Sequence, residues 1–256
     1  MQNRYFGDVG DFGKYGLLRQ LTGVTSSGQN LRLGVVWYLV PDEGHNDDGK
    51  HVSYLGKPEY AACDPKLHSG LKALLSDGIR TVAKIQNSEL LPSNTIYFDE
   101  LLSFEGPPKS IFRSADDRAR YREAWISNAI RTVRSADVIF LDPDNGLEVK
   151  SVKRLSKKGP KYVYWDEVKK FSNQAQTLVI YHHLNRTTSS LKQIELKIGE
   201  FRGRLPEKEV VIPVLFKRGS HRVFFILPSQ AHGPVIENRL REMANSSWAP
   251  HIDILN

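Results

Sequence analysis

Carboxylates and amides collect in this sequence where apolar segments end. Such groups orient water, stabilise developing positive charge and read the edge of a base. The segments that carry them are "GDVGDFGKYG", "WYLVPDEGHNDDG", "VIFLDPDNGLE" and "LVIYHHLNR". The candidate site residues in these segments are Asp8, Asp11, Asp42, His45, Asn46, Asp47, Asp142, Asp144, Asn145, His182, His183 and Arg186.

These clusters are expected to meet, because the carboxyl ends of parallel strands display functional loops at one edge of a sheet. Asp142 follows the apolar run Val138 to Leu141, so its carboxylate is expected to be partly desolvated and to serve as a tuned base. Each cluster also has a structural interpretation. Asp11 is a suitable helix cap, and "DPDNG" is favourable turn chemistry.

Positive charge is concentrated in one part of the chain. The net charge is +7 overall, but residues 150–222 carry +11 and residues 1–149 carry −3. Aromatic residues are interleaved with these cations, which favours a nucleic-acid partner over a solvated lysine-rich surface. The predicted nucleic-acid-binding residues are Lys157, Lys158, Lys161, Lys169, Lys170, Arg218 and Arg222.

Composition excludes several classes of protein. The 256 residues are 40% hydrophobic, with no apolar run of the length that a membrane span requires. The N-terminal residues lack the pattern of a signal peptide. Cys63 is the only cysteine, which excludes an intramolecular disulfide and argues against a zinc-thiolate site. A cytoplasmic protein that is not bound to a membrane is expected, and nothing indicates its oligomeric state.

Hydrophobic patterning predicts alternating strands and helices. Strands are expected at 31–40, 79–85, 95–102, 137–144, 161–167 and 177–184, with a terminal hairpin of 209–216 and 221–228. Helices are expected at 12–22, 64–76, 115–135, 187–203 and 234–244. The predicted fold is a single α/β domain over residues 1–256, a three-layer α/β/α sandwich with a mostly parallel central sheet and a C-terminal antiparallel hairpin.

Two segments resemble strand-end loops of the uracil-DNA glycosylase superfamily. One strand of that family ends in Gly-Gln-Asp-Pro-Tyr, which positions water, and a later strand ends in His-Pro-Ser-Pro. The segments "YLVPDEGHNDDG" and "LVIYHHLNRTTSS" are similar to these in layout. Asp42 is nearest to the family's acid, and His182 or His183 stands in place of its histidine.

This resemblance implies a DNA glycosylase that cleaves the N-glycosidic bond of a flipped base. An acid- and amide-rich pocket would also suit a hydroxyl-bearing modified base of the kind found in some phage DNA, which suggests a role in phage defence. Asp42 and Asp142 would stabilise the oxocarbenium charge or orient water, with Asp47 and Asp144 as the next candidates. His182 or His183 would bind the departing base or a phosphate. DNA is favoured over RNA as partner, and neither a cofactor nor a metal is expected. The substrate-binding set implied is Asp8, Asp11, His45, Asn46, Asn145, His182, His183 and Arg186.

Methyl transfer is the alternative. The segment "DVIFLDPDNGL" resembles the Asp-Pro-Pro-Tyr strand end of amino-methyltransferases that act on adenine or cytosine, and "FGDVGDFGKYGLLRQL" is similar to the opening of a ribosomal-RNA adenine methyltransferase family. Asp144 stands where that motif has its second proline, and Asn145 where it has an aromatic residue. The first strand also lacks a Gly-x-Gly loop for a methionine-sulfonium cofactor.

Two further interpretations stay open. Glu148-Val149-Lys150 forms a Glu-x-Lys element that, with Asp142 or Asp144, is typical of a magnesium-dependent nuclease, although the spacing is short for one. The chain could also be a nucleic-acid-binding adaptor without catalytic activity.

Overall fold

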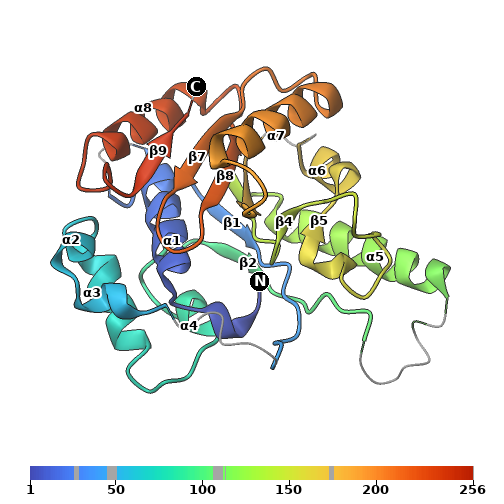
Figure 1. Cartoon of the computed structure of the whole chain (residues 1–256), viewed down its shortest axis with the longest axis horizontal. Helices are drawn as coiled ribbons and strands as arrows, with labels where there is room; N and C mark the ends of the chain where they lie inside the picture. Colours follow the sequence, from blue (N-terminus) through green and yellow to red (C-terminus); the bar gives the residue numbers. More distant parts are fainter. Residues whose placement is uncertain (26–28, 45–50, 106–111, 113, 173–175, 256) are drawn as a thin grey trace.

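A computed structural model of the chain describes residues 1–25, 29–44, 51–105, 112, 114–172 and 176–255 (Figure 1). Its central feature is a seven-stranded sheet with the strand order β2-β1-β3-β6-β8-β7-β9. The bounds of these strands are β1 Leu33–Val36, β2 Ile96–Phe98, β3 Val138–Leu141, β6 Thr177–His183, β7 Ile212–Phe216, β8 Arg222–Leu227 and β9 Ile252–Ile254. A separate two-stranded sheet pairs β4 (Gly146–Leu147) with β5 (Tyr162–Val163).

The strand pairs of the central sheet are parallel on one side and antiparallel on the other. Strands β2, β1, β3 and β6 pair in parallel, with Val35 opposite Phe140 and Phe140 opposite Val179. Strand β8 runs antiparallel to both of its neighbours, β6 and β7, and β9 is antiparallel to β7. The mostly parallel sheet and the C-terminal antiparallel hairpin, β7 and β8, are therefore confirmed.

Helices cover both faces of this sheet (Figure 1). The helices α1, α3 and α8 pack on one face, where they share a core with Val35, Phe140 and Phe224. The helices α5, α6 and α7 pack on the other, with Val36, Leu141 and Phe225. The helix bounds are η1 Asn3–Tyr5, α1 Val9–Thr22, η2 Ser53–Gly56, α2 Pro58–Ala61, α3 Pro65–Leu74, α4 Ala83–Gln86, α5 Ala115–Val133, η4 Gly159–Lys161, α6 Trp165–Ser172, α7 Ser190–Arg204 and α8 Gly233–Ala244.

The three layers follow from the strand sequences. Successive side chains of a strand point to opposite faces, so a strand with helices on both faces must be apolar at every position. Strand β3 illustrates this: Val138 and Phe140 belong to one core, and Ile139 and Leu141 to the other. The strand expected at 31–40 is found as β1, and all four of its residues are buried.

Two predicted strands are wrong. Residues 79–85 were expected to be extended but lead into helix α4; Val82 and Ile85, three residues apart, are the buried positions, which is a helical spacing. Residues 161–167 form only the short strand β5, and helix α6 begins at Trp165. The carboxylate of Glu167 accepts a hydrogen bond from the backbone N–H of Tyr164 at 3.2 Å, which satisfies a donor at the start of this helix.

Helix α1 is buried along its whole length and crosses one face of the sheet. It begins at the N-cap Asp8, whose carboxylate accepts from the backbone N–H of Asp11 at 2.8 Å. It ends at Gly23, whose φ of 88° is the left-handed conformation that closes many helices. The predicted helix 12–22 is confirmed, with a start three residues earlier. Among the described residues, no helix is long and apolar enough to cross a membrane.

Candidate functional site

A cavity of about 880 Å³ opens where helix α1, the end of β3, the end of β6 and the β7–β8 connection meet. Its size is within the range of small-molecule sites in proteins. The residues that line it are Met1, Tyr5, Asp8, Gly10, Asp11, Lys14, His51, Asp142, Pro143, Asp144, Asn145, Tyr181, His183, Leu184, Asn185, Arg186, Thr188, Ser189, Ser190, Gly219, Ser220, His221 and Arg222.

The first turns of α1 supply one wall. Asp11 has one carboxylate oxygen 3.0 Å from the backbone nitrogen of Gly7 and 3.0 Å from the hydroxyl oxygen of Tyr15, both of which donate to it. Its other oxygen accepts from the ammonium group of Lys14 at 2.8 Å. The helix thus holds a carboxylate and a cation one turn apart on the side that faces the cavity.

Lys14 connects this wall to the sheet. Its ammonium nitrogen is also 2.8 Å from Oδ2 of Asp142, at the end of β3, and all three side chains are at most 5% exposed. The rings of Tyr15, Trp37 and Tyr181 each lie with their centres 5.8 Å from the same nitrogen. The cation is therefore fixed in place by two carboxylates and three aromatic faces.

This arrangement changes the ionisation of its members. Burial raises the pKa of Asp142 above its ordinary value, and the charge of Lys14 acts in the opposite direction. Burial alone would lower the pKa of Lys14, but the Asp11 and Asp142 carboxylates outweigh it, so the pKa of Lys14 is raised. Lys14 remains an ammonium ion across the physiological range.

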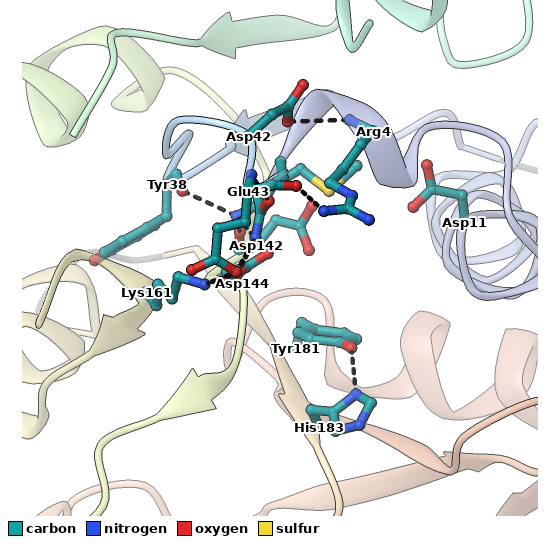
Figure 2. A network of polar contacts seen from close by, with 12 residues as sticks. Arg4, Asp11, Tyr38, Asp42, Glu43, Asp142, Asp144, Lys161, Tyr181 and His183 are labelled. Atoms are coloured by element: carbon teal, nitrogen blue, oxygen red, sulfur yellow. Dashed lines mark hydrogen bonds and ion pairs between the residues drawn. The ribbon is translucent and has the colours of Figure 1, made fainter. Parts of the chain in front are cut away.

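The loop after β3 brings a second acid to the cavity (Figure 2). Oδ2 of Asp144 accepts from the side-chain amide of Gln2 at 2.8 Å and forms an ion pair with Lys161 at 3.3 Å. Lys161 also pairs with Glu43 at 2.6 Å, so it links this loop to the segment after β1. Oδ1 of Asp144 is buried and has no hydrogen-bond partner among the described residues.

Strand β6 and the β7–β8 connection complete the cavity. The hydroxyl of Tyr181 lies 3.1 Å from Nδ1 of His183 (Figure 2). The guanidinium of Arg222 pairs with Asp8 at 3.3 Å. It lies so close to α1 that a Cβ atom at Gly10 would be 2.3 Å from its central carbon, so a larger residue at that position would have to displace the guanidinium. Burial raises the pKa of Asp8, whereas Arg222 acts to lower it.

The structure brings together eight of the predicted site residues. These residues, which all line the cavity, are Asp8, Asp11, Asp142, Asp144, Asn145, His183, Arg186 and Arg222. The predicted residues His45, Asn46 and Asp47 lie outside the described part of the chain. The convergence expected of strand-end loops is therefore found for the N-terminal, β3 and β6 segments.

Asp42 does not belong to this group. It is exposed and is not among the residues that line the cavity. Its carboxylate accepts from the backbone N–H of Arg4 at 3.1 Å (Figure 2). Tyr38, two residues after β1, has a φ of 43°, which is uncommon for a residue other than glycine.

His182 also lies apart from the cavity, because it points to the opposite face of β6 from Tyr181 and His183. Its Nδ1 accepts from the backbone N–H of Leu147 at 3.0 Å. A Cβ atom at Gly146, where φ is 106°, would be 2.4 Å from this nitrogen. Burial lowers the pKa of His182 to about 3, so the ring stays neutral. His182 is a structural residue that holds β4 against β6, and the prediction that it binds substrate is corrected.

The predicted nucleic-acid-binding cations are dispersed. Arg222 lines the cavity and Lys161 lies next to it through Asp144. Lys157 pairs with Glu105 at 2.8 Å, and Lys170 pairs with Glu123. Arg218 donates to Nδ1 of His251 at 2.8 Å, while Lys158 and Lys169 are exposed. These seven residues do not form one cavity-lining group.

Sequence reasoning missed Lys14 and Tyr181. Lys14 follows Asp11 by three residues, which puts both on one side of a helix, and this spacing was the available signal. Tyr181 is two residues from His183 on a strand and so shares its face. Neither pattern indicates that Lys14 would reach a carboxylate 128 positions away along the chain.

The segment with the Glu-x-Lys element lies elsewhere. Glu148 and Lys150 line a separate hollow with Trp165 and Lys197. The carboxylate of Glu148 accepts from the backbone N–H of Trp165 at 3.3 Å. In the part of the chain that the structure describes, no group of three or more His, Cys, Asp or Glu side chains is placed to hold a metal ion.

No family model matches the sequence, and no curated protein does. One solved structure resembles the chain: protein LPL1258 from Legionella pneumophila, described under the family model DUF519. The two are 13% identical, with a TM-score of 0.43 over 98% of this chain and 96% of that one. A likeness of this degree carries no statement about function.

Proposed function

We propose that this chain is a nucleic-acid methyltransferase-like protein that transfers a methyl group to an amino group of an extruded base. The proposal rests on the position of Asp142 and Pro143. They correspond to the first two residues of the Asp-Pro-Pro-Tyr strand end that the segment resembles, they follow β3 directly, and they line the cavity.

The sheet topology supports a nucleotide-type ligand at this point. From β1 the chain adds β2 on one side and then returns to add β3 on the other, so the direction of winding reverses between β1 and β3. In open doubly wound sheets, ligands bind outside the carboxyl ends of the strands at such a reversal. Fold alone does not define function, so this argument is an analogy that favours a nucleoside-bearing ligand.

The proposed reaction implies a methionine-sulfonium cofactor, S-adenosylmethionine, which carries its methyl group on a cationic sulfur. The residues fit such a group in two respects. The cavity volume of about 880 Å³ is in the range of cofactor sites, and Oδ1 of Asp144, 3.9 Å from the Met1 ammonium group, is a buried acceptor without a hydrogen-bond partner among the described residues. Asp144 and the carboxylates near it would attract the positively charged sulfonium group of the cofactor.

Other residues of the cavity lining suit the nucleic acid. Arg186, His183 and His221 are among them and would contact phosphate oxygens of an extruded nucleotide. Asp142, held by Lys14, would fix the backbone of Pro143 beside the base. When the base nitrogen gains its methyl group it loses a proton, which a cavity carboxylate or solvent would accept.

The test is incubation of the purified chain with isotopically labelled S-adenosylmethionine and a panel of unmodified and modified DNAs and RNAs. Digestion to nucleosides and mass spectrometry should find label on one nucleoside. Asp142→Ala should abolish the transfer. Arg131→Gln should not, because Arg131 is exposed near the end of α5 and contacts Asn128. Absence of both label transfer and saturable binding of the cofactor by calorimetry would refute methyl transfer.

Glycosidic hydrolysis stays a prediction. Of its principal residues, Asp142 and His183, one of the two candidate histidines, line the cavity, whereas Asp42 and His182 do not. No specific observation favours it over methyl transfer. The same incubation measures it, because a glycosylase would release a free base and leave alkali-labile sites without cofactor. Strand breaks that chelator prevents would indicate the nuclease instead.

A further inference from the structure

The positive charge of residues 150–222 is not explained by the cavity, because most of its cations lie elsewhere. Some of these cations are neutralised on the surface, as where Lys217 pairs with Asp253 at 2.6 Å. Two others, Lys150 and Arg204, are exposed, and neither is paired with a carboxylate within the described part of the chain. They are far apart in the sequence but line the same hollow.

This hollow, of about 730 Å³, lies between the segment that follows β4 and helix α7. Its lining includes the aromatic side chains of Tyr164 and Trp165, both of which are buried. The ammonium nitrogen of Lys197 is 6.0 Å from the centre of the Trp165 ring, and the guanidinium carbon of Arg204 is 5.8 Å from it. The hollow therefore combines long cationic side chains with aromatic rings.

The acids of the hollow are already bound to other groups. The carboxylate of Glu148 accepts from the backbone N–H of Trp165 at 3.3 Å, and the carboxylate of Glu200 pairs with Lys197 at 2.8 Å. An anionic ligand would thus meet Lys150 and Arg204 without having to break an ion pair of either residue. The positive charge that remains suits a polyanion.

The hollow is connected to the cavity by a short and well-fixed segment. Lys150 follows Asn145, which lines the cavity, by five residues. Five residues of extended chain span at most about 18 Å, which equals the length of roughly five nucleotides of one strand of a duplex. Strand β4 lies within this segment and is fixed to β6, since Leu147 donates to His182 at 3.0 Å. One nucleic-acid strand can therefore reach both places.

We infer that this hollow is a second nucleic-acid contact, in which Lys150 and Arg204 bind backbone phosphates of the strand that flanks the nucleotide in the cavity. The inference rests on the proposed function in taking the cavity as the place of that nucleotide. Cations next to aromatic rings are typical of surfaces along which a nucleic-acid strand lies. Contacts with phosphates fix the position of the strand and are independent of its sequence.

The salt dependence of binding tests this without any chemical step. Fluorescence anisotropy of the intact chain would follow binding of labelled single-stranded DNA and RNA of mixed sequence and about 20 nucleotides, which exceeds the distance between the two places. Loss of one phosphate contact should reduce the slope of log affinity against log salt by about 0.7, and should weaken binding about 5-fold at about 0.1 M salt.

Lys150→Gln and Arg204→Gln should each show this loss, and the double variant should bind about 25-fold more weakly at about 0.1 M salt. Lys66→Gln is the matched control, because it changes the net charge equally but lies exposed on α3, at the opposite face of the sheet. It should retain the wild-type slope. Thermal melting shows whether the variants are folded, and Lys150→Gln remains decisive if the loss of Arg204 disturbs Trp165.

Three results would overturn the inference. The first is a wild-type slope and affinity in Lys150→Gln and Arg204→Gln. The second is the absence of salt-dependent binding of both oligonucleotides. The third concerns a labelled polyglutamate peptide of similar length: if it binds as tightly as the oligonucleotides and both variants weaken it equally, the hollow binds an acidic protein instead.

The two proposals fail separately. Binding of oligonucleotides that depends on Lys150 and Arg204, without any methyl transfer, would support the second contact and refute the proposed function. Methyl transfer by a chain whose binding is unaffected by both substitutions would support the proposed function and refute the second contact.

Discussion

Replacement of Lys14 by methionine keeps the length and much of the volume of the side chain but removes the charge between Asp11 and Asp142. Asp11 retains two other donors, whereas Asp142 Oδ2 loses the ammonium group 2.8 Å away. Removal of one partner from a buried ion pair typically costs about 3–5 kcal/mol, because a charge is left buried without compensation. In a chain of this size the melting temperature should fall by roughly 6–20 °C.

The loss should depend on pH in a defined direction. Burial already raises the pKa of Asp142, and loss of Lys14 removes the main opposing charge, so this pKa rises further in the folded variant. A carboxyl whose pKa is higher in the folded than in the unfolded state favours folding at low pH, and this contribution is lost as the pH rises through the folded value. The deficit relative to wild type should therefore be larger at about pH 8 than at about pH 5.

Urea denaturation of wild type and variant at both pH values measures this directly. Lys192→Met is the control: Lys192 pairs with Glu195 at 3.2 Å on the exposed surface of α7, and its loss should change the free energy of unfolding by less than about 0.5 kcal/mol. A loss below about 1 kcal/mol for Lys14→Met, or one that does not change with pH, would refute the account of Lys14 as the charge that holds this site together.

Other predictions concern single contacts of the site. Gly10→Ala should destabilise the protein by about 1–3 kcal/mol in urea denaturation, because the added carbon meets the guanidinium of Arg222. The control, Gly199→Ala, lies in a helix with open space around it and should stabilise the protein by about 0.5–1 kcal/mol. Similar effects at both positions would contradict this prediction. The pKa of His182 is lowered from 6.5 to about 3, so the stability that this residue contributes is present above pH 6.5 and is lost as the pH falls toward 3. In His182→Gln the amide oxygen still accepts from the backbone N–H of Leu147, but this part of the pH dependence of stability should disappear. An unchanged pH profile of stability would argue against a neutral buried ring.

Much of the fold could be predicted because its signals are local. A strand covered on both faces must be apolar throughout, so the segment that contains β3 was recognisable without knowledge of its neighbours. A residue that directly follows such a strand lies at the carboxyl end of the strand, and Asp142 and Asp144 are found there, in the cavity wall. The failures at 79–85 and 161–167 were short apolar runs, in which strand and helix patterns are hard to distinguish.

The sequence by itself determined the α/β class, the apolar strands and the acids that follow them, since each of these depends on residues close together in the chain. Only the tertiary structure decided that Lys14 reaches Asp142, that His183 faces the cavity while His182 is buried behind it, and that Asp42 lies outside. These outcomes depend on which strands are neighbours and on which face each side chain takes. Both are set by packing between segments distant along the chain, and local composition does not encode them.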